Sequence, residues 1–303
     1  SRRKAAFFGK VAYSVASLSI VIKTMAQFFL FLSVGYGSGA AGILHKSVLA
    51  DLGKLLTKIL IPVMIFFSIY SDNSLAKLTA ALPIFPAAVV FYLLLALILK
   101  AASAVLRLPR ESSGVFQISF LFGNTGFVGI PLITSLFSAN GMSFFALFSI
   151  IDQFALWTYG VFLVQAGNAR KISFRSFINP ASVSILLAIL FVCTGIRLPS
   201  VLDNTVSSLS KTASVLCMIY LGAMVRFTDL RPVIRKREVY YGIGIKQILF
   251  PLLSALLLST VGISGEMRGV LIVLSMLPTM TAVPIIVKNS GSDGDYAAGI
   301  AVM

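Results

Sequence analysis

One acidic residue of this sequence lies in the middle of an apolar stretch. Asp152 is surrounded by Ile150, Ile151 and Phe154, whereas the other acidic residues fall in loops or at the ends of apolar blocks. An ionised carboxylate at the centre of a membrane helix costs about 2.5–3.5 kcal/mol on insertion scales. A residue that costs this much usually has a partner or a function. Asp152, with Gln153 beside it, is therefore a candidate ion-coupling site that binds Na⁺ or exchanges a proton.

Lys246 is the basic residue nearest the middle of a later apolar block. Two interpretations remain open. It is either a fixed structural partner of Asp152, or a counter-charge that takes part in ion coupling and substrate binding. Lys23 and Lys58 lie nearer the ends of their blocks, so we expect them to extend toward the membrane surface.

Two further apolar blocks are interrupted by residues that disfavour helix. Residues 123–131 read GNTGFVGIP, and residues 277–284 read LPTMTAVP. At membrane depth, a break in a helix must be buried in protein or line a cavity, because its free backbone groups need partners. The alternative is that these residues form ordinary kinks and close-packing points. The candidate substrate-binding residues are Asn124, Thr125, Gly126, Pro278, Thr279 and Thr281.

The composition of the chain excludes an ordinary water-soluble domain. Of its 303 residues, 58% are hydrophobic and 12% are charged, whereas a soluble domain carries roughly 25% charged residues. The apolar blocks are continuous rather than alternating, which favours helices over a barrel. The fold class is therefore all-α integral membrane protein. The net charge of +15 indicates basic cytoplasmic loops rather than a nucleic-acid partner.

The apolar blocks predict ten transmembrane helices, near residues 17–38, 55–71, 79–99, 113–137, 142–166, 178–196, 205–225, 239–262, 266–287 and 293–303. Residues 1–16 form a basic lead, and we expect the tenth helix to be incomplete. A polar linker, 167–177, divides the chain into 17–166 and 178–303. Five helices in each half give the halves opposite orientations, which is the arrangement of an inverted repeat. The interrupted helices are the fourth of each half, so we expect helices four and nine to cross.

Basic residues set the expected orientation. Most loop Lys and Arg residues follow odd-numbered helices, which places the linker 167–177 in the cytoplasm and the amino terminus outside. The opposite orientation, with the amino terminus in the cytoplasm, is favoured by four basic residues near the start of the sequence: Arg2, Arg3, Lys4 and Lys10. The apolar surroundings of Cys193 and Cys217, with a single histidine, exclude a structural zinc site. No paired carboxylates or serine–histidine pair lie in mid-membrane, so we expect neither an enzyme nor a metal or organic cofactor.

The sequence of residues 123–131 resembles the fourth-helix signature of the auxin efflux carrier family, whose members include bacterial organic-acid carriers and the plant PIN-FORMED transporters. Three other stretches agree with this resemblance, which extends over about residues 17–303. They are Ile178-Asn179-Pro180, Tyr220-Leu221-Gly222-Ala223 and Met276-Leu277-Pro278-Thr279. Many relatives have an asparagine where this chain has Ala282, with Thr281 beside it.

The resemblance implies a scaffold of helices one, two, six and seven that forms a homodimer. It also implies a transport domain of helices three to five and eight to ten. The expected function is cation-coupled, alternating-access transport of small organic anions, including auxin-like carboxylates, in a plasma membrane or bacterial inner membrane. Its expected partners are an organic anion, membrane lipid and, as coupling ion, Na⁺ or H⁺. A sodium/proton antiporter, a bile-acid-type sodium symporter and a transporter-like membrane sensor are the alternatives.

Overall fold

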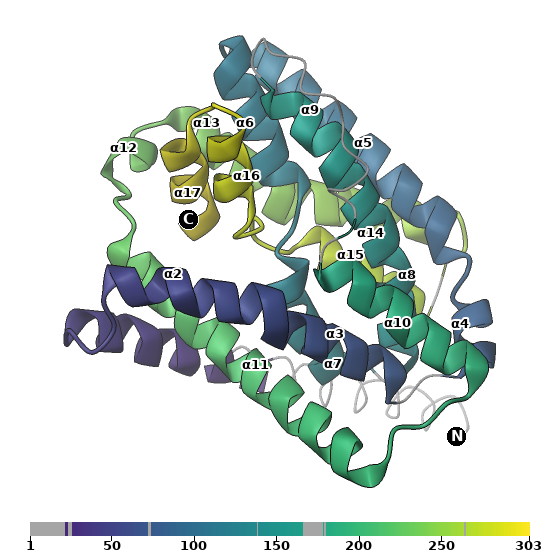
Figure 1. Cartoon of the computed structure of the whole chain (residues 1–303). Helices are drawn as coiled ribbons and strands as arrows, with labels where there is room; N and C mark the ends of the chain where they lie inside the picture. The colour runs from purple at the N-terminus through teal and green to yellow at the C-terminus, as the bar shows by residue number, and fades with distance from the viewer. Residues whose placement is uncertain are drawn as a thin grey trace, which may run out of the picture.

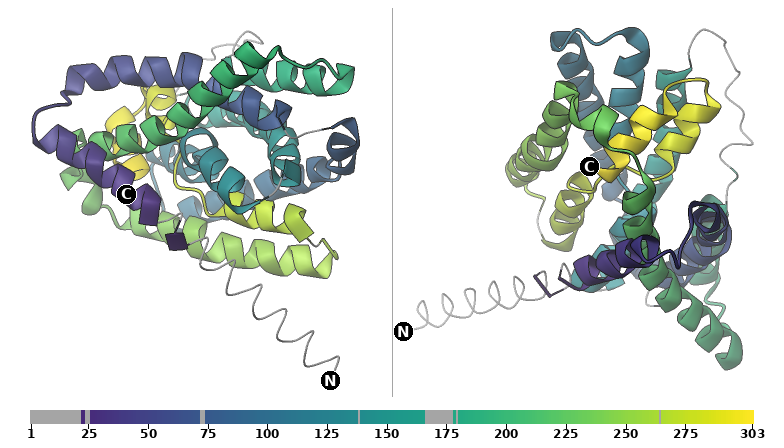
Figure 2. Two further views of the ribbon diagram at one scale, coloured as in Figure 1. Left: turned by 90° about the horizontal axis from the view of Figure 1, so that it is seen from below. Right: turned by 90° about the vertical axis from the view of Figure 1, so that its left-hand side faces the viewer.

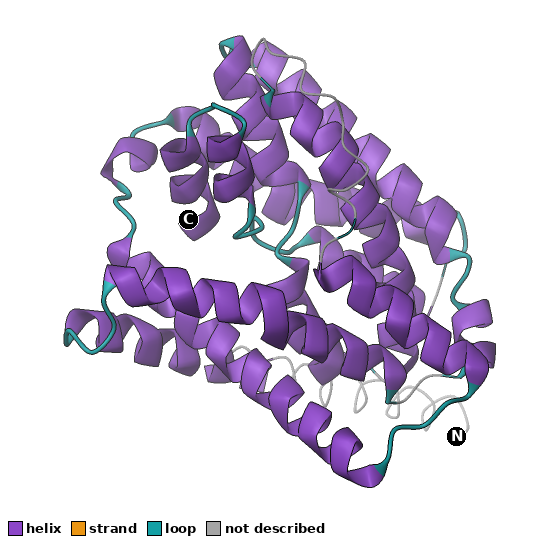
Figure 3. Ribbon diagram, in the orientation of Figure 1, coloured by secondary structure: helices purple, strands orange, loops and turns teal. Residues whose placement is uncertain are grey.

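The computed structural model describes residues 22–23, 26–71, 74–137, 139–165, 178, 180–263 and 265–303, and its elements are helices (Figures 1 and 3). The basic lead 1–16, the linker 167–177 and Asn179 lie outside these residues. Residues 26–40 form the first described helix. The later α-helices are α2 (Lys46–Leu55), α3 (Ile61–Tyr70), α4 (Leu75–Ala80), α5 (Ile84–Val105), α6 (Arg110–Leu121), α7 (Ile130–Leu136), α8 (Ala139–Ala155), α9 (Val161–Val164), α10 (Pro180–Thr194), α11 (Ser200–Phe227), α12 (Arg231–Ile234), α13 (Arg237–Gly244), α14 (Phe250–Thr260), α15 (Gly265–Ser275), α16 (Val283–Asn289) and α17 (Gly294–Val302).

Short π-helical segments extend several of these helices. The segments η1 (Leu56–Leu60), η3 (Leu156–Gly160) and η5 (Ile245–Leu249) join α2 to α3, α8 to α9 and α13 to α14, and η2 (Thr125–Gly129) leads directly into α7. Five continuous helices are then long and apolar enough to cross a membrane, among the residues described. They are Lys46–Tyr70, Ile84–Val105, Asn140–Val164, Ser200–Phe227 and Arg237–Thr260. Shorter apolar helices cover Thr125–Leu136 and Pro180–Thr194. These spans confirm a multi-pass membrane protein.

Both helices that the sequence predicts to be broken are interrupted. Between α6 and η2, residues 122–124 leave the helical conformation, and between α15 and α16 residues 276–282 do so. Figure 3 draws both interruptions as loops between helices. Glycine and proline account for them, because glycine is entropically costly in a helix and proline removes a backbone donor.

The described helices fall into two groups, which also contact each other through α8 with α3 and α10 and through η2 with α11. In the first, α3 packs against α10 and α11, and α11 also packs against α2. In the second, α5 packs against α6 and α8, α15 packs against α8 and α14, and α17 packs against α6 and α16. Figure 1 shows α2, α3, α10 and α11 crossing one side of the molecule, with α5, α6, α8, α13 and α14 to α17 on the other. The side view in Figure 2 shows the same division.

Small residues bring the helix of residues 26–40 into direct contact with α11. A Cβ atom at Gly35 would lie 2.0 Å from the carbonyl oxygen of Ile219, and one at Gly222 would lie 2.0 Å from that of Leu32. Neither position therefore accepts a side chain without movement of the helices. Such reciprocal close approach is how membrane helices gain packing energy in the absence of a hydrophobic driving force.

Candidate functional site

The two interrupted helices meet at their breaks. The Asn124 N–H donates a 2.7 Å hydrogen bond to the carbonyl oxygen of Pro278, and the Met280 N–H donates one of 3.0 Å to that of Phe122. Gly123 and Thr279 thereby form an isolated antiparallel bridge. Each break supplies partners for the backbone groups that the other has freed. This satisfies the requirement that buried backbone polar groups be hydrogen-bonded.

Close approach at this bridge depends on Gly123. A Cβ atom there would lie 2.8 Å from the Cβ atom of Leu277, which is inside van der Waals contact. On the far side of the bridge, the Asn124 side chain caps the π-helical segment η2. Its Oδ1 atom accepts a 3.2 Å hydrogen bond from the Phe127 N–H. The glycine of the sequence GNTG thus permits close approach to the second break, and its asparagine caps the helix that begins after the first break.

A cavity of about 1060 Å³ opens beside the bridge. Its walls include both breaks, the helix that runs from α8 to α9 and the helix that runs from α2 to α3. Polar side chains lie among apolar and aromatic ones. The polar and charged lining residues are Thr57, Lys58, Asn124, Thr125, Ser149, Gln153, Gln165, Thr281, Asn289 and Ser290. Among the described residues that line the cavity, none is acidic.

Asp152 lies behind this wall, fully buried in α8. The Tyr92 hydroxyl, from α5, donates a hydrogen bond to Oδ1 of its carboxylate. The Gln153 side-chain amide donates one of 3.2 Å to Oδ2. The Thr125 hydroxyl also interacts with this carboxylate. Thr125 and Gln153 both line the cavity. A single layer of side chains therefore separates the buried carboxylate from the cavity.

Lys246 is also buried, and only 2% of its surface is exposed. Its Nζ atom lies 5.8 Å from the ring centre of Phe91 and 6.0 Å from that of Phe250. It interacts electrostatically with Asp152, but the two make no direct salt bridge in the described part of the chain. Two buried charges of opposite sign therefore lie near each other, with hydrogen bonds from Tyr92 and Gln153 on the carboxylate itself.

The structure places the predicted site residues in three positions. Asn124, Thr125, Gly126, Thr281 and Gln153 line the cavity. Pro278 and Thr279 belong to the bridge and contribute backbone to the crossing rather than side chains to the cavity wall. Asp152 and Lys246 are buried beyond the wall. The first two positions lie at the bridge between the two breaks or on the cavity wall beside it.

Sequence reasoning missed three residues of this region. Tyr92, the hydrogen-bond donor to Asp152, is one of several aromatic residues in an apolar span, and nothing in its own spacing distinguishes it. Trp157, another aromatic residue of an apolar block, lines the cavity. Lys58, expected to extend toward the membrane surface, is exposed and lines the cavity as well.

Three prolines follow π-helical turns. The segments η1, η2 and η5 end two residues before Pro62, Pro131 and Pro251. A proline cannot donate a backbone hydrogen bond, and its ring crowds the carbonyl four residues earlier. A wider turn relieves this crowding, and such turns recur at functional sites. Each of the three carries a polar residue of the site region: Lys58 in η1, Thr125 in η2 and Lys246 in η5.

The spans, the paired breaks and the cavity define a multi-pass membrane protein with a polar compartment between its helices. The model of the membrane transport protein family, the auxin efflux carrier family, matches residues 20–302, so the chain belongs to this family. An uncharacterized transporter of Methanocaldococcus jannaschii is 26% identical over 257 residues, which cover 81% of this chain and 82% of the relative. An uncharacterized transporter of Methanothermobacter thermautotrophicus is 21% identical over 290 residues, covering 93% and 92%. The family confirms the resemblance seen in the sequence and makes the chain a transporter with a small-molecule substrate.

Proposed function

We propose that the protein is a secondary active transporter of small organic anions, with carboxylates as its substrates. The observation that carries this proposal is the cavity beside the bridge, whose described lining combines Lys58, several amides and hydroxyls, and an apolar remainder, without an acidic side chain. Amides and hydroxyls donate hydrogen bonds to a carboxylate. Aliphatic and aromatic side chains such as Ile61 and Trp157 accommodate its organic part.

Alternating access would move the crossing relative to the remaining helices. The group formed by residues 26–40, α2, α3, α10 and α11 corresponds to the scaffold implied by family resemblance, and the second group to the transport domain. The division of packing into these two groups supports this assignment. The bridge supports a 5+5 inverted repeat, because it pairs breaks at matching places in the two halves. We expect the scaffold group to form the homodimer interface.

Coupling would occur at Asp152. Its carboxylate is buried, has hydrogen-bond donors from two helices and interacts with Thr125 on the cavity wall. Binding of Na⁺ or of a proton there would change the charge beside Thr125, and so the position of the substrate-binding wall. Gln153 and Lys246 would contribute to the same site, the first by its amide and the second by its charge.

The test is uptake into proteoliposomes that contain the purified protein. The panel is labelled acetate, benzoate, indole-3-acetate, succinate and citrate, each under a Na⁺ gradient, a proton gradient or neither. We expect at least one carboxylate to accumulate, and to follow one of the two gradients. If none accumulates under any gradient, the proposal is wrong. Cation exchange without carboxylate movement would indicate a sodium/proton antiporter. Tight binding without transport would indicate a membrane sensor.

A further inference from the structure

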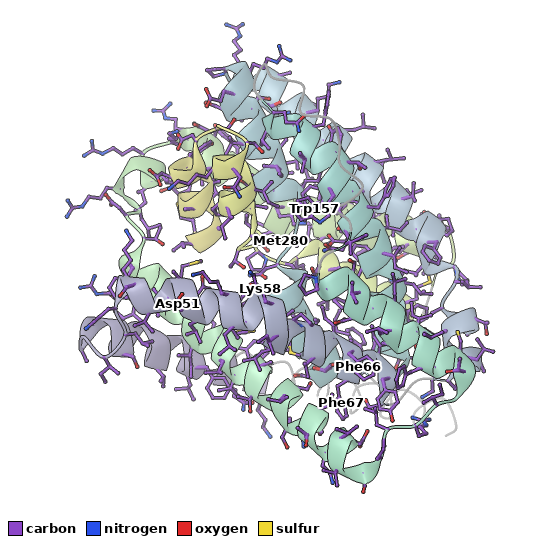
Figure 4. All side chains as sticks on the ribbon, in the orientation of Figure 1. Asp51, Lys58, Phe66, Phe67, Trp157 and Met280 are labelled. Carbon is purple, nitrogen blue, oxygen red and sulfur yellow. The ribbon has the colours of Figure 1, made fainter. Side chains whose placement is uncertain are left out.

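Lys58 is the one charged side chain among the described residues that line the cavity. It lies in η1, between α2 and α3, on the helix opposite the bridge. Figure 4 shows Lys58 on the side of this helix that faces Met280, a residue of the second break. The described lining therefore has one positive charge, on an exposed side chain, on one wall and the bridge between the two breaks on another.

Lys54, in the same continuous helix, provides a comparison. Lys54 pairs with Asp51 through a 2.8 Å salt bridge, in which both side chains are mostly exposed. Lys58, four residues later, makes neither a salt bridge nor a hydrogen bond with any residue that the structure describes. Both lysines are exposed, but Lys54 pairs with Asp51, whereas Lys58 lines the cavity and has no ion-pair partner among the described residues.

We propose that Lys58 is the residue that binds the carboxylate of the substrate and makes the cavity selective for anions. This inference rests on the proposed function and adds to it the group that recognises charge. A carboxylate between Lys58 and the crossing would be held by an ammonium from one wall and by hydrogen bonds from Asn124 or Thr281 on the other. Hydrogen bonds that involve two ionised groups are about twice as strong as neutral ones.

The number of charges also sets which anions fit. One positive charge neutralises one carboxylate, and a second carboxylate would find only neutral amides, hydroxyls and apolar side chains in the described lining. An uncompensated charge in such surroundings carries a large desolvation cost. The cavity therefore favours singly charged carboxylates with an apolar body over dicarboxylates.

The experiment compares Lys58→Gln and Lys58→Arg with Lys54→Gln, a matched control from the same helix that does not line the cavity. KM and maximal rate are measured in proteoliposomes for every panel carboxylate that the unmodified protein accumulates. In Lys58→Gln we expect KM to rise about tenfold or more, as loss of a charge-assisted hydrogen bond predicts. Lys58→Arg keeps the charge and should stay within about threefold of the original KM. Lys54→Gln should leave KM unchanged.

A second measurement reports charge selectivity directly. Binding of benzoate and of its uncharged amide, benzamide, is compared by calorimetry on the purified proteins. The unmodified protein should prefer benzoate, and Lys58→Gln should lose that preference while Lys54→Gln keeps it. If the unmodified protein transports a carboxylate and Lys58→Gln transports it with the same KM and the same charge preference, the role of Lys58 is overturned and the proposed function stands. If the unmodified protein moves no carboxylate, the proposed function itself fails, and the role of Lys58 with it.

Discussion

The Tyr92 hydroxyl donates a hydrogen bond to the carboxylate of Asp152 and so joins α5 to α8. The Tyr92 ring in turn stacks on Phe122, with ring centres 5.7 Å apart. The carbonyl oxygen of Phe122 accepts the Met280 hydrogen bond that holds the bridge. The carboxylate of Asp152 is thus linked to the bridge between the two breaks through the stacked pair of Tyr92 and Phe122.

Replacement of Asp152 by asparagine tests the coupling site. We expect Asp152→Asn to abolish gradient-driven accumulation, because the amide neither ionises nor exchanges a proton. The variant should fold and insert, since the amide oxygen can still accept the Tyr92 hydrogen bond. The measurement is accumulation in proteoliposomes under the driving gradient. Asp51→Asn, which removes an exposed carboxylate, is the control and should retain full accumulation. Undiminished accumulation in Asp152→Asn would refute the coupling role.

Replacement of Tyr92 by phenylalanine tests the link to α5. The variant removes one hydrogen bond to the buried carboxylate and keeps the ring that stacks on Phe122. We expect a stability loss of about 1 kcal/mol, the usual net worth of a hydrogen bond. We also expect weaker dependence of uptake on the coupling ion. The measurement is uptake against ion concentration, with Tyr159→Phe as the control. A dependence identical to that of the unmodified protein would show that Tyr92 is structural only.

A side chain at Gly123 tests the crossing itself. In Gly123→Ala, the new methyl group would lie 2.8 Å from the Cβ atom of Leu277, and the two breaks would have to separate. We expect a destabilisation of about 1–3 kcal/mol, as for other overpacked interiors, together with loss of transport. Gly244→Ala is the control, because no atom lies within 4 Å of its added methyl group. Thermal unfolding in detergent and uptake are measured on both variants. Normal stability and uptake in Gly123→Ala would contradict the observed closeness of the bridge.

The contact between the helix of residues 26–40 and α11 gives a prediction about the stability of the folded chain. Gly35→Ala would place a methyl group 2.0 Å from the Ile219 carbonyl oxygen, whereas the same change at Gly37 meets no atom within 4 Å. We expect the Gly35 variant to lower the unfolding temperature in detergent, since the two helices must move apart. Gly37→Ala should leave it unchanged. Equal unfolding temperatures for the two variants would show that this contact contributes no stability.

The sequence by itself determined the membrane class, the positions of the five long spans and the location of both breaks. These features depend on local chemistry: apolar length decides whether a helix crosses a membrane, and glycine and proline decide where it is interrupted. Residues 122–124 and 276–282 leave the helical conformation where the sequence predicts them to do so. The GNTGFVGIP stretch also determined the family, which the match over residues 20–302 confirms.

The tertiary structure alone decided which side chains face one another. A helix that is apolar on all sides gives no sign of which face turns inward, so Lys58 and Trp157 could not be placed in the cavity from the sequence. The hydrogen bond from Tyr92 to Asp152 joins residues 60 positions apart. The antiparallel bridge between Gly123 and Thr279 pairs backbone groups from opposite halves of the chain. Such contacts depend on how helices rotate and cross, and that is set by packing of the whole molecule rather than by local sequence.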